Sequence, residues 1–211
     1  MPKVAQDHWQ GIYQSKQENE VSWYQNRPDL SLSFIERYCP DKTASIIDVG
    51  GGASRLIDYL IGMGYQQLSV LDISQNALNH SQQRLQSILP QHQAEINWTV
   101  ADITRATFST SFDLWHDRAV FHFLTEPESR QSYIANLKAS LQVGGYLVIA
   151  TFAIGGPEKC SGLDIVQYDA DKLQEALGDD FELVSQQTEN HHTPFNSEQA
   201  FNYFVFRYFT H

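Results

Sequence analysis

Cysteine is scarce in this sequence: Cys39 and Cys160 are the only two in 211 residues. They lie far apart and outside any metal-binding spacing, which argues against a disulfide framework and against a metal site. Basic runs are also missing, because 14 Lys and Arg stand against 25 Asp and Glu, giving a net charge of −11. Binding to a phosphate backbone needs clustered positive charge. We therefore expect no metal and no nucleic-acid partner.

Long hydrophobic runs are absent as well. The N-terminus MPKVAQDHWQ lacks the apolar core of a signal peptide. The longest apolar stretches, such as residues 146–154, are strand-sized, far short of the roughly 20 residues of a membrane helix. With 42% hydrophobic residues, the chain has enough apolar surface for a core. These features predict one globular domain over residues 1–211, cytoplasmic and without a membrane partner.

The hydrophobic pattern divides the chain into three parts. Residues 1–40 are polar but carry aromatic residues, and Trp9, Ile12 and Tyr13 share one face of a predicted helix. A second helix is expected over residues 30–38. Strands and helices then alternate over residues 45–152, and a C-terminal helix and β-hairpin are expected over residues 153–211. The strands of the central part are predicted at residues 45–49, 68–71, 96–100, 112–116 and 146–152.

The alternation predicts an α/β fold with a doubly wound sheet. Leu141 is expected on the core face of the last helix of this part, which Gly144 and Gly145 would end. Residues 181–185 and 201–209 are predicted to form an antiparallel pair. The last of these strands is apolar on both faces, so we expect it inside the sheet and not at its edge. The resulting fold class is Rossmann-like, with a seven-stranded sheet that is mostly parallel and has an antiparallel C-terminal strand.

The segment Asp48-Val49-Gly50-Gly51-Gly52 joins the first strand to its helix. Glycines at such a junction let the backbone approach a ligand closely. Asp72 ends the next strand, where a carboxylate can accept hydrogen bonds from two ribose hydroxyls. Asp102, after the third strand, lies where an adenine amino group would be recognised. A glycine turn alone is common, but together with these two carboxylates it predicts an adenosine-binding site.

A nicotinamide dinucleotide is the obvious rival ligand. Its fingerprint requires glycine at the first, third and sixth positions, which here are Gly50, Gly52 and Arg55. The third glycine permits close packing of helix on strand beneath a pyrophosphate, and Arg55 does not. The spacing therefore favours an adenosine-bearing ligand without phosphates, such as S-adenosylmethionine (SAM).

The ordered motifs resemble those of the class I SAM-dependent methyltransferases. They are Asp48 to Ser54, Leu71-Asp72-Ile73-Ser74, Ala101-Asp102-Ile103-Thr104 and Leu141-Gln142-Val143-Gly144-Gly145. The resemblance covers residues 45–152, and the C-terminal hairpin is similar to the reversed last strand of that family. It implies that Gly50, Gly52, Asp72, Ile73 and Asp102 hold SAM. Asp48, Ile103 and His116 are further candidates for cofactor contacts.

Aromatic residues of the N-terminal part restrict the resemblance to two groups of methyltransferases within this class. Trp9, Tyr13, Trp23 and Tyr24, with Asp117-Arg118-Ala119 after the fourth strand, are similar to two groups. One comprises thiopurine-type small-molecule S-methyltransferases, the other the eukaryotic elongation-factor lysine methyltransferases. The resemblance implies that the four aromatic side chains form a lid over the cofactor. Ordinary helix packing is the alternative.

Methyl transfer needs a base only if the acceptor arrives protonated. His116 is a candidate base, or else a cap or cofactor contact, and Asp117 is the second candidate catalytic residue. Asp117 and Arg118 could instead form an ion pair that orders the loop. Cys160 could bind a soft acceptor or be merely structural. His122, in an apolar helix over residues 120–124, is expected to be a core residue.

These features favour methyl transfer to a small soft nucleophile such as a thiol. A protein lysine methyltransferase is the alternative enzyme, and a SAM-binding interaction or sensor module is the alternative without turnover. The chain lacks the Asn/Asp-Pro-Pro-aromatic motif of methyltransferases that act on nucleic-acid amino groups. The oligomeric state stays open.

Overall fold

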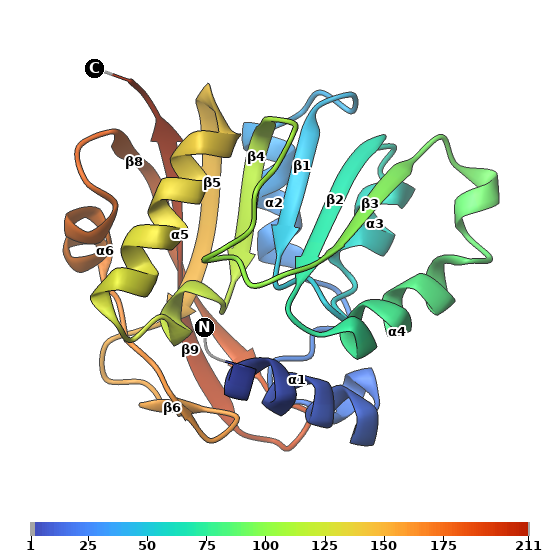
Figure 1. Cartoon of the computed structure of the whole chain (residues 1–211), viewed down its shortest axis with the longest axis horizontal. Coiled ribbons are helices and arrows are strands. Elements are labelled where there is room, and N and C mark those ends of the chain that lie inside the picture. Colours follow the sequence, from blue (N-terminus) through green and yellow to red (C-terminus); the bar gives the residue numbers. More distant parts are fainter. Residues whose placement is uncertain (1–2, 211) are drawn as a thin grey trace.

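The computed structural model describes residues 3–210, with side chains from residue 5 onward, and has one seven-stranded sheet at its centre (Figure 1). The strand order is β3-β2-β1-β4-β5-β9-β8. The first five strands of that order are mutually parallel, and β9 runs antiparallel to both β5 and β8. The predicted sheet, with an antiparallel strand inserted near its end, is confirmed. The strands are β1 (Ser45–Val49), β2 (Gln67–Asp72), β3 (Glu95–Val100), β4 (Phe112–Arg118), β5 (Leu141–Phe152), β8 (Phe181–His192) and β9 (Glu198–Tyr208).

Helices cover both faces of this sheet, as a parallel sheet requires. The core on one face contains side chains of α2 (Asp29–Tyr38), α3 (Leu56–Gly62) and α4 (Gln75–Leu85). The opposite core contains side chains of α5 (Pro127–Ser140) and α6 (Ala170–Leu177). Among the described residues, no helix is both long and apolar enough to cross a bilayer.

The first helix, α1 (Lys3–Ser15), lies apart from these two layers. It packs on α4 and crosses the sheet edge at which the parallel strands end, at the bottom of Figure 1. Gln10 fixes it there, because its Oε1 accepts hydrogen bonds from Ser74 Oγ and from the backbone N–H of Asn76. The short helix η1 (Glu18–Glu20) follows before α2 begins.

The boundary between α5 and β5 differs from the prediction. The helix ends at Ser140, and Leu141 already pairs with Phe112 as the first residue of β5. Gly144 has φ +86°, and a Cβ on Gly145 would lie 2.8 Å from the carbonyl oxygen of Asp113. The two glycines therefore lie in a strand irregularity pressed against β4, and they do not end a helix.

Other elements are longer or shorter than expected. The hairpin β8–β9 extends well beyond the predicted strands. The apolar helix predicted at residues 120–124 is a single turn, η3 (Phe121–Phe123). The turn η2 (Leu89–Gln91) precedes β3, and a small hairpin of β6 (Lys159–Cys160) and β7 (Leu163–Asp164) was not predicted. This hairpin lies near α1, at the same edge of the sheet (Figure 1).

Candidate active site

The glycine turn after β1 is shaped by backbone geometry that side chains would block. Gly50 has φ +71°, and a Cβ there would lie 2.1 Å from Val120 Cγ2. A Cβ on Gly52, whose φ is +35°, would lie 2.6 Å from Asp72 Oδ2. The N–H of Gly50 donates to the carbonyl of Leu71 at 2.7 Å, which joins the turn to the end of β2. The glycines thus let the turn pass close to both Val120 and Asp72.

Asp72 is a buried carboxylate at the end of β2, only 7% exposed. Its Oδ1 accepts a hydrogen bond from the N–H of Ser74, the N-cap residue of α4. Burial raises the pKa of this carboxyl to about 7, with a smaller raise from Asp48 and an opposing effect of the Ser74 N–H. A buried carboxylate with spare acceptor capacity is suited to hydroxyl donors of a ligand.

Asp102 and Ile103 follow β3 at the same edge. Asp102 Oδ1 accepts hydrogen bonds from the N–H and the hydroxyl of Thr104 at 2.9 and 2.8 Å. The carbonyl of Ile103 accepts a hydrogen bond from Asn136 of α5, which fixes the loop. Both residues line a cavity at the sheet edge together with Asp72 and Ile73.

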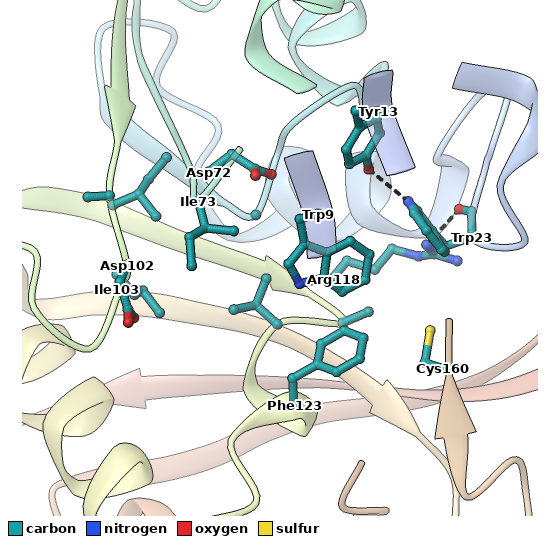
Figure 2. Close-up of a pocket in the computed structure, with 15 residues that line it drawn as sticks. Trp9, Tyr13, Trp23, Asp72, Ile73, Asp102, Ile103, Arg118, Phe123 and Cys160 are labelled. Atoms are coloured by element: carbon teal, nitrogen blue, oxygen red, sulfur yellow. Dashed lines mark hydrogen bonds between the residues drawn. The ribbon is translucent and has the colours of Figure 1, made fainter. Parts of the chain in front are cut away.

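This first cavity, together with the solvent-open space at its mouth, has an empty volume of about 700 Å³. Figure 2 shows its two ends. Asp72, Ile73, Asp102 and Ile103 lie at one end, and aromatic rings with Arg118 and Cys160 lie at the other. Its lining consists of Trp9, Tyr13, Trp23, Gly50, Leu71, Asp72, Ile73, Ala101, Asp102, Ile103, Arg118, Ala119, Val120, Phe123 and Cys160.

Three of the four predicted lid aromatics meet at this cavity. The ring of Trp9 stands edge-on to Trp23 at 5.5 Å and to Phe123 at 5.2 Å. Trp23 Nε1 donates to the hydroxyl of Tyr13 at 3.2 Å (Figure 2). Tyr24 lines a second, adjoining cavity instead. The N-terminal part therefore supplies an aromatic wall to a site built from the sheet.

The second cavity contains the predicted residues Asp48 and His116. These two residues are direct neighbours in the register of β1 and β4, so their side chains meet on one face. His116 Nδ1 donates to Asp48 Oδ1 at 2.7 Å, and its Nε2 lies 2.9 Å from Ser31 Oγ of α2. Both ring nitrogens form hydrogen bonds, and His116 does not line the first cavity. Its position therefore favours a structural role, joining β1, β4 and α2, over the removal of a proton from an acceptor.

Asp117 points to the opposite face of β4 and lines neither cavity. It is fully buried and accepts hydrogen bonds from the N–H groups of Val120 and Phe121 and from the Tyr133 hydroxyl. Burial raises the pKa of this carboxyl to about 6, against the lowering effect of these donors. The geometry argues against the predicted catalytic role, because Asp117 shapes the turn after β4 and faces away from the ligand side.

The predicted ion pair of Asp117 with Arg118 is wrong. Adjacent residues of a strand point to opposite faces, so the two side chains diverge. Arg118 lies over the ring of Phe201 at 4.4 Å and donates to the Tyr203 hydroxyl and to the carbonyl of Trp23. Its nearest acidic partner is Glu189 of β8, at 3.8 Å. Arg118 lines both cavities and so stands at their junction.

Two further candidates lie close to the aromatic wall. Cys160 of β6 lines the first cavity, and burial raises the pKa of its thiol to about 12, so it stays protonated at neutral pH. His122 is completely buried and its pKa is lowered to about 3, chiefly by burial and secondarily by Arg118. Its position agrees with the expected core role.

Sequence reasoning missed Phe123, Ala119 and Val120 as lining residues. The sequence feature that could have identified them is the apolar run after β4, but its pattern predicts a buried helix face and not the wall of a cavity. Ala119 has φ +72°, a left-handed conformation that is uncommon for a residue with a Cβ, and the preceding strand and following turn fix it there. Among the described residues, no cluster of three or more His, Cys, Asp or Glu side chains is arranged to hold a metal ion.

Comparison with known proteins shows what this chain is similar to. A methyltransferase-domain family matches residues 47–147. The eEF1A lysine and N-terminal methyltransferase of Danio rerio is 26% identical over 162 residues, which are 72% of this chain and 23% of that protein. The chain thus spans less than a quarter of the length of that relative.

Solved structures share the fold over nearly the whole chain. The N-methyltransferase NodS from Bradyrhizobium japonicum WM9, in complex with S-adenosylhomocysteine (SAH), has a TM-score of 0.70 at 17% identity, covering 96% of this chain and 99% of that one. A structure described for the conversion of a disulfide bond into a thioacetal group during echinomycin biosynthesis has a TM-score of 0.73 at 15% identity, covering 97% and 91%. The methyltransferase-domain match over residues 47–147 and the shared seven-stranded fold together support a SAM-dependent methyltransferase with the class I fold.

Proposed function

We propose that the chain transfers the methyl group of SAM to a small, soft nucleophile, such as a thiol, that is methylated as an anion. The observation that carries the proposal is the division of the first cavity into two unlike ends. One end bears Asp72 and Asp102, the only two acidic side chains among the lining residues that the structure describes. The other end bears aromatic rings and the cation of Arg118.

The acidic end fits the adenosine part of SAM. Asp72 would accept hydrogen bonds from the ribose hydroxyls, and Asp102 from the adenine amino group, with Ile73 and Ile103 beside the adenine ring. Gly50 and Gly52 would let the backbone approach the methionine part, which extends toward the second cavity with Asp48 and His116. When bound, SAM supplies an electrophilic methyl group on a sulfonium, and the chain needs only to align an acceptor with it.

The aromatic end supports an anionic acceptor. Arg118 is always protonated and would stabilise a thiolate, whereas it would repel the ammonium group of a lysine. Trp9, Trp23 and Phe123 give this end an apolar lining, and the lower local polarity would strengthen that attraction. Among the described lining residues, none at this end offers an unengaged base: the Cys160 thiol is protonated, and burial also raises the pKa of Tyr13 far above neutrality. An acceptor that ionises near neutral pH needs no base.

A protein lysine methyltransferase is the second candidate, favoured by the similarity to the Danio rerio protein. The two candidates separate in one experiment, in which labelled SAM is incubated with the chain and either a panel of thiols or a cell lysate. We expect label in small thioethers. Label found only on protein bands would reject the small-molecule acceptor, and SAM left unaltered with every acceptor would favour a binding module without turnover.

A further inference from the structure

The segment between α1 and α2, residues 16–28 and here termed the strap, covers the second cavity. Glu18, Val21, Tyr24 and Gln25 line one side of that cavity, and the glycine turn lines the other. Trp23 of the strap also lines the first cavity. A ligand that reaches from Asp72 into the second cavity would therefore lie between the strap and the glycine turn.

Glu18 fastens the strap next to the glycine turn. Its carboxylate accepts hydrogen bonds from Arg55 Nε at 3.1 Å and Arg55 Nη2 at 2.5 Å, and from Arg84 Nη1 of α4. Arg55 directly follows the glycine turn, and Arg84 also donates to the carbonyl of Ser54 in that turn. One carboxylate thus joins the strap to both sides of the loop that would hold the methionine part of SAM.

The same contact can break without leaving a buried charge alone. Arg84 keeps two hydrogen bonds to Asp58 of α3, at 2.7 and 2.8 Å, when Glu18 leaves. The side chain of Arg55 is 32% exposed, so water can replace its partner. Because both arginines remain satisfied, release of Glu18 costs far less than the loss of a buried partner normally does.

The other end of the strap is held by different contacts. Gln25 donates to both carboxylate oxygens of Glu189 in β8, and the carbonyl of Ser22 lies 2.7 Å from His191 Nε2. The carbonyl of Trp23 accepts from Arg118. On this side the strap is thus held by β8 and by Arg118 of β4, through two backbone carbonyls and one side-chain amide. On the α3 side, Asn26 and the ring of Tyr24 add contacts with Arg55 to those of Glu18.

We propose that the strap is a gate for the cofactor, and that Glu18 is the latch whose release from Arg55 and Arg84 sets the rate of cofactor exchange. The proposal rests on the proposed function only in that SAM and SAH are the ligands of the cavity. The hinge of the motion is the side that faces β8 and β4, where the strap stays attached, and the latch opens on the α3–α4 side.

The test uses SAH as the probe and the fluorescence of Trp9 and Trp23, which line the cavity, as the signal in stopped-flow mixing. In the unaltered chain the association rate should level off at high SAH, at the rate of strap opening. Glu18→Gln should raise both this limiting rate and the dissociation rate, each by about tenfold, the factor for one charge-assisted hydrogen bond at ~1.4 kcal/mol. The Kd should change less than either rate. Added NaCl should speed exchange in the unaltered chain but not in Glu18→Gln.

Asp29→Asn is the matched control. Asp29 lies just beyond the strap, and its carboxylate forms an exposed ion pair with Arg27 of the strap. The substitution should leave both rates unchanged. If Glu18→Gln folds poorly, Arg55→Gln removes part of the latch and should act in the same direction. Unchanged rates, or faster dissociation with unchanged association, would overturn the gate while leaving SAM as the ligand. Failure of the unaltered chain to bind SAH would overturn the gate and the proposed function together.

Discussion

At the scale of single residues, Asp72 ties ligand binding to pH. Its carboxyl pKa of about 7 reflects burial, and hydrogen bonds from ribose hydroxyls would favour the ionised form. Binding therefore lowers the pKa and expels a proton below pH 7. We expect the affinity for SAH to be constant above pH 7 and to fall by up to about tenfold per pH unit below it, as measured by calorimetric titration.

Asp72→Asn should weaken SAH binding by about 1.5–3 kcal/mol, the range for a hydrogen bond to a charged group, and should flatten the pH dependence. Asp41→Asn is the control, since Asp41 is an exposed carboxylate that bonds to Thr43 in the turn before β1. A pH dependence that persists unchanged in Asp72→Asn would show that another group titrates.

Gly50 offers a second residue-scale prediction. Gly50→Ala places a Cβ against Val120 at a positive φ, so it should destabilise the chain by about 1–3 kcal/mol and abolish SAH binding. Gly62→Ala is the control, because Gly62 lies in α3 with open space around it, and alanine there should be neutral or stabilising. Thermal melts with and without SAH measure both effects, and normal binding by Gly50→Ala would contradict the proposed role of the turn.

At the scale of elements, the turn from β4 into η3 depends on Asp117. Asp117→Asn weakens its hydrogen bonds to two backbone N–H groups and to Tyr133, so the free energy of unfolding should fall by about 2–4 kcal/mol. Tyr133→Phe removes the hydroxyl that donates to Asp117 and that also accepts from the buried Trp115 Nε1–H, so it should cost about 1–3 kcal/mol. Urea unfolding measures both variants. A variant Asp117→Asn with normal stability but no turnover would instead return Asp117 to a catalytic role.

The elements also show what sequence patterns can and cannot predict. The strands β1, β2 and β5 were predictable from their buried and mostly apolar stretches, residues 46–49, 68–72 and 147–152. Leu141 fits the apolar spacing of the helix before it as well as the strand that it begins, so the boundary of α5 was misplaced. The far half of β8 is polar and is a strand only because it pairs with β9, which is a tertiary effect.

The same division holds for the site. The glycine turn and the two carboxylates at the ends of β2 and β3 are local motifs, so they could be identified as site candidates from the sequence alone. Arg118 was paired with the acidic residue next to it in sequence, whereas its partners come from β9, β8 and the strap. Glu18 and Arg55 are 37 residues apart, and neither residue carries a local signal of their contact. Contacts of this kind depend on the assembled fold.

At the scale of the whole molecule, the account depends on which ligand the assembled cavity binds. A thermal-shift comparison of SAH with NAD tests this most directly, since a ligand that binds only the folded chain stabilises it by about 2.7 kcal/mol at 100 times its Kd. We predict that SAH raises the melting temperature in a concentration-dependent manner and that NAD leaves it unchanged. A shift with NAD, or none with SAH, would contradict the account.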